Sequence, residues 1–339
     1  MGAMKQLLPF GGATLLETVI GNVRRSRVDE IIVVLGASAD EIRQRIGGDP
    51  LRIVVNPDFR EGMGTSLRCG IAQVRGDAAL VVLADQPFVE PATIDRLIEE
   101  YREKKPQITI PVYRGFRGNP VLLDRSVFSE IMGLGGDIGC RAIFGGHSDN
   151  ILKVSVDDAG VLLDMDTRED FERLQLPEAR TIESADLSGR ATDSRPQVVI
   201  VGTEKIGRTL AKIAGLVNFG VTIIDPFLPP GQAPEADRVL HLLDFSALGT
   251  AADSFVVIAT GGRFDEEAVE QALRCGSRYI ALVANRKRAA EVLGRVTGFE
   301  PEKVSSVRTK AGIDIRAEGP EEIALSIMAE IIAERHRTQ

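Results

Sequence analysis

The sequence predicts an α/β protein built from two three-layer domains, each with a mostly parallel sheet. Three observations lead to this prediction. Strand-like apolar runs alternate with helical stretches over residues 1–176, and the alternation stops at 177–195, a stretch rich in Ser, Thr, Asp, Glu and Arg. A second alternating series then occupies 196–339. We therefore expect a first domain over 1–176, a linker over 177–195 and a second domain over 196–339.

Composition narrows the functional class. The chain has 339 residues, 44% of them apolar and 27% charged, which is typical of a soluble globular protein. A net charge of −8 argues against nucleic-acid binding through a broad basic surface. No apolar run reaches the roughly 18 residues of a membrane helix, and no leader resembles a signal peptide, so we expect a cytoplasmic protein. A homodimer stays open.

Cysteines and histidines are few and dispersed. The three cysteines form no CxxC pair, and the three histidines are equally scattered. We therefore expect neither a disulfide framework nor a zinc site of His and Cys ligands.

The first series begins with a helix that Thr14 can cap. A capping box at 38–41 should open the next helix, and Pro91 suits the first turn of a later one. We expect helices over 14–26, from 38, and over 65–74, 91–103 and 126–132, near 140 and from Arg168, with strands at 31–35, 51–55, 108–112, 120–123 and 151–156.

A central element lies between these, where an apolar run from Ala78 ends abruptly in Asp85, Gln86 and Pro87. This pattern predicts a buried parallel strand that carries a carboxylate at its C-terminal end, where open α/β sheets place their ligands. Pro87 prevents the strand from continuing. Such an aspartate can hold a divalent metal against a nucleotide phosphate.

The second series repeats the alternation. Its closing helix has an apolar stripe that includes Ile323, Ile327 and Ile331. We expect strands at 197–201, 221–224, 255–259 and 279–283, and helices over 206–216 and 266–274, from 287, and over 320–335.

Several ordered motifs of the first series resemble those of the MobA-like nucleotidyltransferases, in particular the molybdenum cofactor cytidylyltransferase group. The segments that carry the resemblance are 1–2 with 5–9, 56–64 with 66–67 and Gly70, 83–87, 115–120, 136–141 and 164–170. The resemblance implies transfer of CMP from CTP to the molybdopterin cofactor, with Mg²⁺ and release of pyrophosphate. Such a transfer needs positioning and charge neutralisation more than covalent work by the protein.

The resemblance also implies site residues. Asp85 and Asp166 would hold the metal, and Lys5 would contact the triphosphate. The nucleotide or acceptor would be bound by Gly62, Met63, Gly64, Ser66, Gln86, Gly118, Asn119, Asp137 and Arg141. Structural alternatives stay open for several of these residues. Asp85 could cap the helix near Pro91, Asp137 could pair locally with Arg141, and only one of Asp164 and Asp166 can face the site. Cys140 suits packing better than metal binding.

The same resemblance implies a glycine-rich loop and a first strand immediately before Met1. The loop would supply backbone N–H groups to the triphosphate. We expect the native protein to begin upstream, since Met1 and Gly2 match the interior of that motif.

The second series contains a partial dinucleotide pattern. Gly202 and Gly207 follow a strand, and Asp225 ends the next strand about 20 residues later. Glu204 replaces the middle glycine and would bring bulk and negative charge to the pyrophosphate, which disfavours NAD(P). Residues 197–335 resemble the Rossmann domain of the XdhC/CoxI family, chiefly at 312–315 and 320–327. Arg286 and Lys287 could contact an anion there, or could be a solvated basic pair of the kind that helix N-termini often carry.

The two resemblances together predict a fusion that acts on molybdenum cofactor. The first domain would make the cytidylylated cofactor, and the second would bind it or contact a xanthine dehydrogenase-type hydroxylase. The alternatives are a non-catalytic cofactor chaperone and a nucleotidyltransferase for another phosphorylated acceptor.

Overall fold

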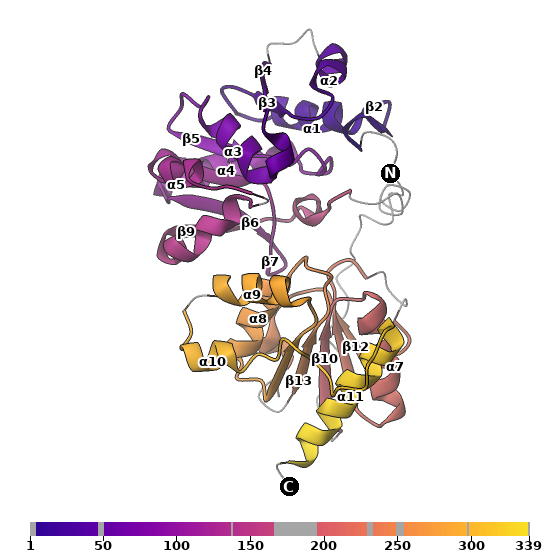
Figure 1. Cartoon of the computed structure of the whole chain (residues 1–339). Coiled ribbons are helices and arrows are strands. Elements are labelled where there is room, and N and C mark those ends of the chain that lie inside the picture. The colour runs from indigo at the N-terminus through magenta and orange to yellow at the C-terminus, as the bar shows by residue number, and fades with distance from the viewer. Residues whose placement is uncertain are drawn as a thin grey trace. The chain divides into compact units, whose positions relative to one another are not determined.

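The chain folds into two compact units, each an α/β domain, as the sequence predicts. In the computed structural model the described residues are 5–46, 51–136, 138–165, 195–228, 233–248, 254–296 and 298–337. One unit comprises Met1–Tyr113 with Arg117–Arg180, and the other comprises Arg114–Phe116 with Thr181–Gln339 (Figure 1). The predicted helix from Arg168, and the predicted linker except Arg195, lie outside the described residues, so the exact boundaries stay predictions.

The first unit keeps the predicted order of elements. Its helices are α1 (Leu15–Arg24), α2 (Ala39–Ile46), α3 (Met63–Ile71), α4 (Pro91–Lys104) and α5 (Phe128–Met132), with the short 3₁₀ turns η1 (Lys5–Leu7), η2 (Phe59–Glu61), η3 (Arg125–Val127), η4 (Cys140–Asn150) and η5 (Ala159–Leu162). Its strands are β1 (Pro9–Phe10), β2 (Ala13–Thr14), β3 (Ile32–Leu35), β4 (Arg52–Val55), β5 (Ala78–Val81), β6 (Ile108–Tyr113), β7 (Phe116–Arg117), β8 (Val121–Asp124) and β9 (Ile151–Ser155).

Two main sheets form in this unit. β3 and β4 pair in parallel as a two-stranded sheet. A five-stranded sheet has the order β5-β8-β6-β7, with β9 paired in parallel to β6. Three buried clusters pack the helices against these sheets, one of them joining α1 and α2 to β3.

The prediction for the central apolar run was wrong in two respects. β5 pairs antiparallel with β8, because β8 returns beside it after α4 and β6. The side chains of β5 are also half-buried rather than buried. The strand ends at Val81, so Asp85 follows it after a three-residue turn segment.

The predicted capping of α2 was also wrong. Ser38 has a φ of 54°, in the left-handed region, whereas an N-cap residue has extended backbone. The helix itself is present.

Thr14 caps α1 as predicted, through a complete capping box. Its hydroxyl accepts from the Glu17 N–H at 3.2 Å, and the Glu17 carboxylate accepts from the Thr14 N–H at 2.7 Å. These bonds, led by that with the Thr14 side chain, lower the pKa of Glu17 from 4.5. A lowered folded pKa gives stability that is present above pH 4.5 and is lost as the pH falls through the folded value.

We therefore expect Thr14→Ala to lower the free energy of unfolding by about 1 kcal/mol at pH 7. The difference from the wild type should shrink as the pH falls through the lowered pKa of Glu17, where the folded protein loses this carboxylate charge. Urea unfolding at several pH values measures this. A difference that is constant down to pH 3 would contradict the capping-box account.

The second unit is a single parallel sheet covered by helices. Its strands are β10 (Gln197–Val201), β11 (Gly220–Ile224), β12 (Arg238–Leu240), β13 (Phe255–Ile258) and β14 (Tyr279–Leu282), in the order β12-β11-β10-β13-β14. Its helices are α7 (Lys205–Leu216), α8 (Asp265–Arg274), α9 (Arg286–Arg295), α10 (Pro301–Ser305) and α11 (Pro320–His336), with the 3₁₀ turn η7 (Phe245–Leu248).

All neighbouring strands of this sheet are parallel. The strand order reverses at β10, so the carboxyl ends of β10 and β13 border the crevice where such folds bind ligands. α11 packs along α7 through its predicted stripe, with Ile327, Met328 and Ile331 buried. In the described parts of the chain, no helix is long and apolar enough to span a membrane.

Candidate functional site

The predicted catalytic pair is in contact in the first unit. Lys5 Nζ lies 3.0 Å from Asp85 Oδ2, and the two side chains are 24% and 31% exposed. Asp85 Oδ1 is buried and has no hydrogen-bond partner among the described residues. A buried carboxylate oxygen without a donor is costly unless a cation or ligand satisfies it. Asp85 therefore pairs with Lys5 through Oδ2, while Oδ1 has no hydrogen-bond partner among the described residues.

Gln86 connects Asp85 to a second carboxylate. Its side chain is 2% exposed, and Nε2 donates to Asp164 Oδ1 at 2.6 Å. The backbone N–H of Met165 donates to the carbonyl of Asp85 at 3.0 Å, so the two segments run side by side. The sequence left open which of Asp164 and Asp166 faces the site. Asp164 is held by Gln86, while Asp166 lies outside the described residues.

Gly118 and Asn119 join this cluster through Val161. The Val161 carbonyl accepts from Asn119 N–H at 2.9 Å and from Gln86 Nε2 at 3.5 Å. A Cβ on Gly118 would lie 2.5 Å from the same carbonyl oxygen, so only glycine fits there. The structure thus brings together Lys5, Asp85, Gln86, Gly118, Asn119 and Asp164.

The alternative role considered for Asp85, capping α4, is performed by another residue. Asp158 Oδ2 accepts from Glu90 N–H at 2.9 Å and from Thr93 Oγ1 at 2.8 Å. Because Asp158 caps the start of α4, Asp85 is not needed as a cap there. Asp158 was not singled out by sequence reasoning, since it is distant in sequence from the helix it caps.

A second cluster forms around the N-terminus of α3. Gly62 has a φ of 114°, and Met63 is 49% exposed. Gly64 N–H donates to Gly136 O at 3.0 Å, which ties the segment to the glycine-rich turn. Asn56, 2% exposed, donates from Nδ2 to the hydroxyls of Thr65 and Ser66 at 2.8 and 2.9 Å. The amides near Met63 and Ser66 are therefore held in place by Asn56, a role that its position before a proline did not reveal.

We expect Asn56→Ala to destabilise the first unit by about 2 kcal/mol, because Thr65 and Ser66 lose a buried donor and Asp58 N–H loses its acceptor. Chemical unfolding measures the change. Asn150→Ala, at an exposed asparagine, is the matched control and should shift stability by less than about 0.5 kcal/mol. Equal effects of the two substitutions would show that Asn56 does not organise this loop.

The remaining predicted residues of the first unit are less defined. Asp137 lies outside the described residues, so its predicted ion pair with Arg141 stays a prediction. Arg141 lies at the start of η4 and is half-buried. Burial raises the pKa of the neighbouring Cys140 thiol to about 11. The thiol is therefore protonated at neutral pH, and Cys140 packs against a core cluster, as expected for a structural residue.

The donor set at Asp85 suits a hard divalent cation. Carboxylate oxygens are the protein ligands that Mg²⁺ prefers, usually one or two of them together with substrate phosphates. Among the described residues no three His, Cys, Asp or Glu side chains converge on a point that could bind a metal. The cation would therefore depend on phosphate oxygens as well as Asp85.

Of the predicted ligand residues of the second unit, Gly202 and Asp225 directly follow β10 and β11, and Gly207 lies in the first turn of α7. Gly202 has a φ of 96°, and a Cβ there would lie 2.5 Å from the Ala259 carbonyl oxygen. A Cβ on Gly207 would lie 2.5 Å from the Gly202 carbonyl oxygen, so both glycines serve close packing. Asp225 is 3% exposed and accepts from Thr203 N–H and Oγ1 through Oδ2, and from Phe227 N–H through Oδ1. Its oxygens are therefore engaged by the protein rather than open to a ribose.

Charged residues surround the crevice between β10 and β13. Arg263 pairs with Glu204 at 3.2 Å, at the position where a dinucleotide pyrophosphate would need a glycine. Arg286 and Lys287 are exposed in the first turn of α9. Arg288 instead points inward, 3.4 Å from Asp265 Oδ2 and within hydrogen-bond distance of Gly262 O. Sequence reasoning missed Arg288. Which of three consecutive basic residues points inward depends on how the helix packs, and the sequence alone does not show this.

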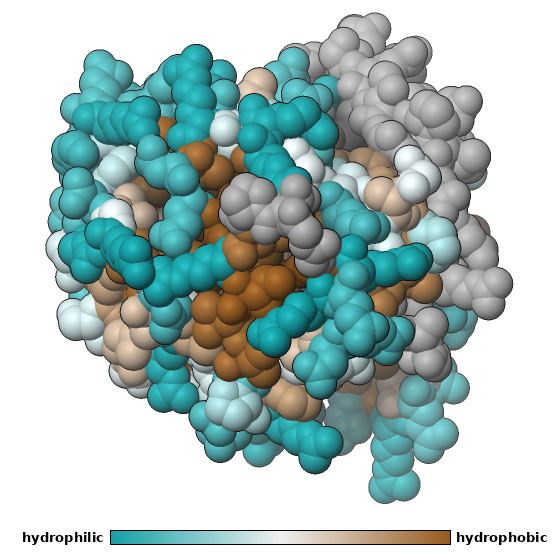
Figure 2. Space-filling view, turned by 90° about the horizontal axis from the view of Figure 1, so that it is seen from above, coloured by the Kyte–Doolittle hydropathy of each residue, from teal (hydrophilic) through white to brown (hydrophobic). Residues whose placement is uncertain are grey.

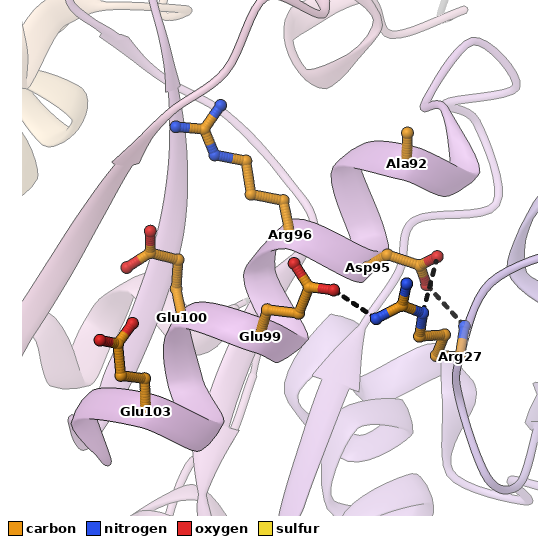
Figure 3. A pocket seen from close by; sticks show the side chains of 7 residues that line it. All are labelled: Arg27, Ala92, Asp95, Arg96, Glu99, Glu100 and Glu103. Carbon is orange, nitrogen blue, oxygen red and sulfur yellow. Dashed lines mark hydrogen bonds and ion pairs between the residues drawn. The ribbon is translucent and has the colours of Figure 1, made fainter.

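A pocket of about 460 Å³ lies elsewhere, along the outer face of α4 (Figure 3). Acidic side chains of α4 line it, with Arg27 paired to Asp95 and Glu99. None of the predicted site residues lines it, and its carboxylates carry no orphaned polar atom. The Asp85 cluster is therefore the better candidate for chemistry.

Comparisons with known proteins identify both units. Residues 1–151 match the family model of the MobA-like NTP transferase domain, and residues 198–331 match that of the XdhC Rossmann domain. The chain is 31% identical over 179 residues to nicotine blue oxidoreductase of Paenarthrobacter nicotinovorans, covering 50% of this chain and 87% of that protein. It is 26% identical over 174 residues to molybdenum cofactor cytidylyltransferase of Escherichia coli (strain K12), covering 50% and 86%. A solved manganese complex of Rv0371C from Mycobacterium tuberculosis H37Rv is 33% identical, with a TM-score of 0.47, over 51% of this chain and 92% of that one.

Proposed function

The chain belongs to the MobA-like NTP transferase family through its first unit and carries an XdhC Rossmann domain in its second, and from this we propose that it matures molybdenum cofactor. The first unit would transfer CMP from CTP to the molybdopterin cofactor and release pyrophosphate. The observation that carries this proposal is the Asp85 carboxylate, which pairs with Lys5 through one oxygen and keeps the other buried without a partner.

The residues of this cluster match what the transfer needs. The acceptor phosphate attacks the α-phosphorus of the nucleotide, and the bond to pyrophosphate breaks, so negative charge moves to the leaving group. Lys5 supplies a mobile positive charge near that group. Gln86 fixes Asp164 beside Asp85, and Asn56 fixes the amides at the start of α3. Mutual positioning of this kind accounts for much of the rate in a reaction that needs no protein nucleophile.

Asp85 would hold Mg²⁺, with Asp164 or Asp166 as a second carboxylate. When bound, the cation would neutralise charge on the phosphates and on the departing pyrophosphate. Gly118 and Asn119, joined to Gln86 through Val161, would border the acceptor.

The second unit would bind the product or contact a xanthine dehydrogenase-type hydroxylase, as its family implies. Tethering both units in one chain raises the effective concentration of product at the second site. Arg286 and Lys287, exposed at the start of α9, would contact an anionic group of that ligand. The engaged oxygens of Asp225 and the Glu204–Arg263 pair argue against NAD(P) here.

Two relatives suggest different chemistry for the first unit. One is named molybdenum cofactor cytidylyltransferase and the other nicotine blue oxidoreductase. A carboxylate with an open oxygen beside a lysine favours phosphate chemistry over hydride transfer. Another phosphorylated acceptor and a non-catalytic chaperone are the remaining alternatives.

One assay separates these functions. The protein is incubated with Mg²⁺ and molybdopterin cofactor, with CTP or GTP, and pyrophosphate is measured; a parallel reaction follows NAD(P)H oxidation. We expect CTP-dependent pyrophosphate release. Oxidation of NAD(P)H without pyrophosphate would favour the oxidoreductase, and cofactor binding without either reaction would favour the chaperone.

A further inference from the structure

Asn22 is a polar residue on the buried side of α1. On the face of the first unit that Figure 2 shows, hydrophilic residues surround an apolar middle. Asn22 does not belong to such a polar surface: it is 8% exposed, on a helix whose Ile20 and Val23 pack in apolar clusters. Asparagine forms helices less readily than alanine, and its amide is costly to bury without partners. The reason for an asparagine here therefore lies in its contacts.

The Asn22 side chain holds the loop that follows β5. Its Nδ2 donates to Pro87 O at 2.8 Å and to Val89 O at 3.0 Å, across 65 and 67 residues of chain. Pro87 and Val89 are buried, and in the described part of the chain no backbone N–H donates to either carbonyl. Because a buried carbonyl needs a donor, one amide group satisfies two carbonyls that the loop leaves open.

Arg25 fixes the direction in which this amide faces. Its Nη2 donates to Asn22 Oδ1 at 2.6 Å, a short bond from a charged donor. The reversed amide would set Oδ1 against two carbonyl oxygens and Nδ2 against the guanidinium, so all three contacts would be repulsive. The orientation that serves the loop is therefore the one with matching donors and acceptors.

The loop held by Asn22 contains Asp85 and Gln86. On its other side the Asp85 carbonyl and the Gln86 amide bind the 164–165 segment. Pro87 follows Gln86 directly and has a fixed φ, so the chain has little freedom between the Asn22 contact and Asp85. A displacement at Pro87 would therefore also displace the carboxylate.

The same helix positions Lys5. Leu8 N–H donates to Lys5 O at 3.2 Å, and Leu8 O accepts from Leu15 N–H, at the start of α1, at 3.0 Å. Leu7 packs against the core cluster that contains residues of α1. The helix is thus joined to Lys5 near its start and to the Asp85 loop near its end. The 3.0 Å contact between Lys5 and Asp85 depends on both connections.

We propose that Asn22, oriented by Arg25, is a positioning residue for nucleotidyl transfer. It holds the loop of Asp85 against α1, the helix that also holds Lys5, and so sets where the carboxylate lies relative to metal-bound phosphate. Asn22 acts through the loop and not on the substrate. The inference rests on the proposed function for its chemical meaning, while the placement of the loop is measured without turnover.

The test variant is Asn22→Asp at pH 8. Its carboxylate keeps the shape of the side chain and the bond from Arg25 but cannot donate to the loop carbonyls. The readouts are pyrophosphate release with CTP and the cofactor, electron paramagnetic resonance of Mn²⁺ bound with CTP, and the NMR signals of the Gln86 side-chain amide. Since misplacement of a reacting group by about 1 Å can cost roughly 10²-fold in rate, we expect transfer to fall at least about tenfold. Mn²⁺ should bind at least about threefold more weakly. The Gln86 amide protons should shift upfield as the bond to Asp164 lengthens.

The matched control is Tyr101→Phe. It also removes a buried hydrogen bond between distant segments, from Tyr101 Oη to Asp124 Oδ2 at 2.6 Å. This contact lies beside Asp77, before β5, whereas Asp85 follows that strand. The control should lower the urea midpoint as the test variant does, but leave transfer, Mn²⁺ binding and the Gln86 signals as in the wild type.

A second variant keeps the test decisive if Asn22→Asp does not fold. Arg25→Ala changes an exposed side chain and removes only the group that orients the amide. We expect transfer to fall about threefold, with the same direction of shift at Gln86. Arg43→Ala, at an exposed arginine of α2, should change neither.

Gln86 signals and Mn²⁺ binding that are the same in Asn22→Asp and Arg25→Ala as in the two controls would overturn the inference, because the loop would then keep its place without Asn22. Lower stability alone would assign Asn22 to folding and would overturn it equally. A wild type that releases no pyrophosphate would overturn the proposed function instead, and the Gln86 signals would still decide whether Asn22 places the loop.

Discussion

Asp85→Asn is expected to lower CMP transfer by about 10³-fold while the first unit stays folded. The substitution keeps the shape of the side chain and removes its charge. It therefore weakens the attraction to a cation at Oδ1 and the pairing with Lys5 at Oδ2, 3.0 Å away. The carboxylate is 31% exposed, so loss of its charge should change the free energy of unfolding by less than about 1 kcal/mol.

The measurement combines pyrophosphate release with binding of Mn²⁺ in the presence of CTP, followed by electron paramagnetic resonance. The binding readout applies even where turnover is slow. Asp95→Asn is the matched control, because Asp95 lines the pocket on α4 and pairs with Arg27. A loss of Mn²⁺ binding with Asp95→Asn but not with Asp85→Asn would move the site to that pocket.

Gly202→Ala should destabilise the second unit by about 3 kcal/mol. The added Cβ would lie 2.5 Å from the Ala259 carbonyl oxygen and 2.8 Å from Thr260 Cα, so backbone must move. The residue also has a φ of 96°, which disfavours any side chain. Separation of the β10 and β13 carboxyl ends would disturb the crevice as well as the sheet.

Gly276→Ala isolates the steric contribution. Gly276 has a φ of 65°, but nothing lies within 4 Å of the Cβ position. We expect this control to cost about 1 kcal/mol, the conformational penalty alone. Urea unfolding measures the stability of both variants, and hydrogen exchange is followed at the amides of β10 and β11. Equal losses of unfolding free energy in the two variants would show that the backbone near Ala259 can move away from the added Cβ.

Local patterns predicted the helices and most strands, because apolar periodicity and caps are encoded within one element. Thr14 and Pro91 begin their helices as expected. The direction of β5 was wrong, because its pairing with β8 depends on a strand 40 residues away. The short strand β12 and the helix α10 were missed, since neither is long enough to show a period.

The candidate site was predictable in part. Motif order singled out Asp85, Lys5 and Gln86, and these residues lie together. The choice between Asp164 and Asp166 could not be made from an alternating segment, because either face could turn inward. Asn56 and Asp158 act through contacts that cross 9 and 65 residues of chain, which only the fold reveals.

In the proposed function, the Asp85 cluster transfers a nucleotidyl group to the molybdopterin cofactor. The most direct measurement is pyrophosphate release from CTP with Mg²⁺ and the cofactor, comparing the wild type with Asp85→Asn. We expect release that requires both CTP and cofactor and falls about 10³-fold in the variant. Equal release by wild type and variant, or none from either while the folded protein still binds the cofactor, would contradict it.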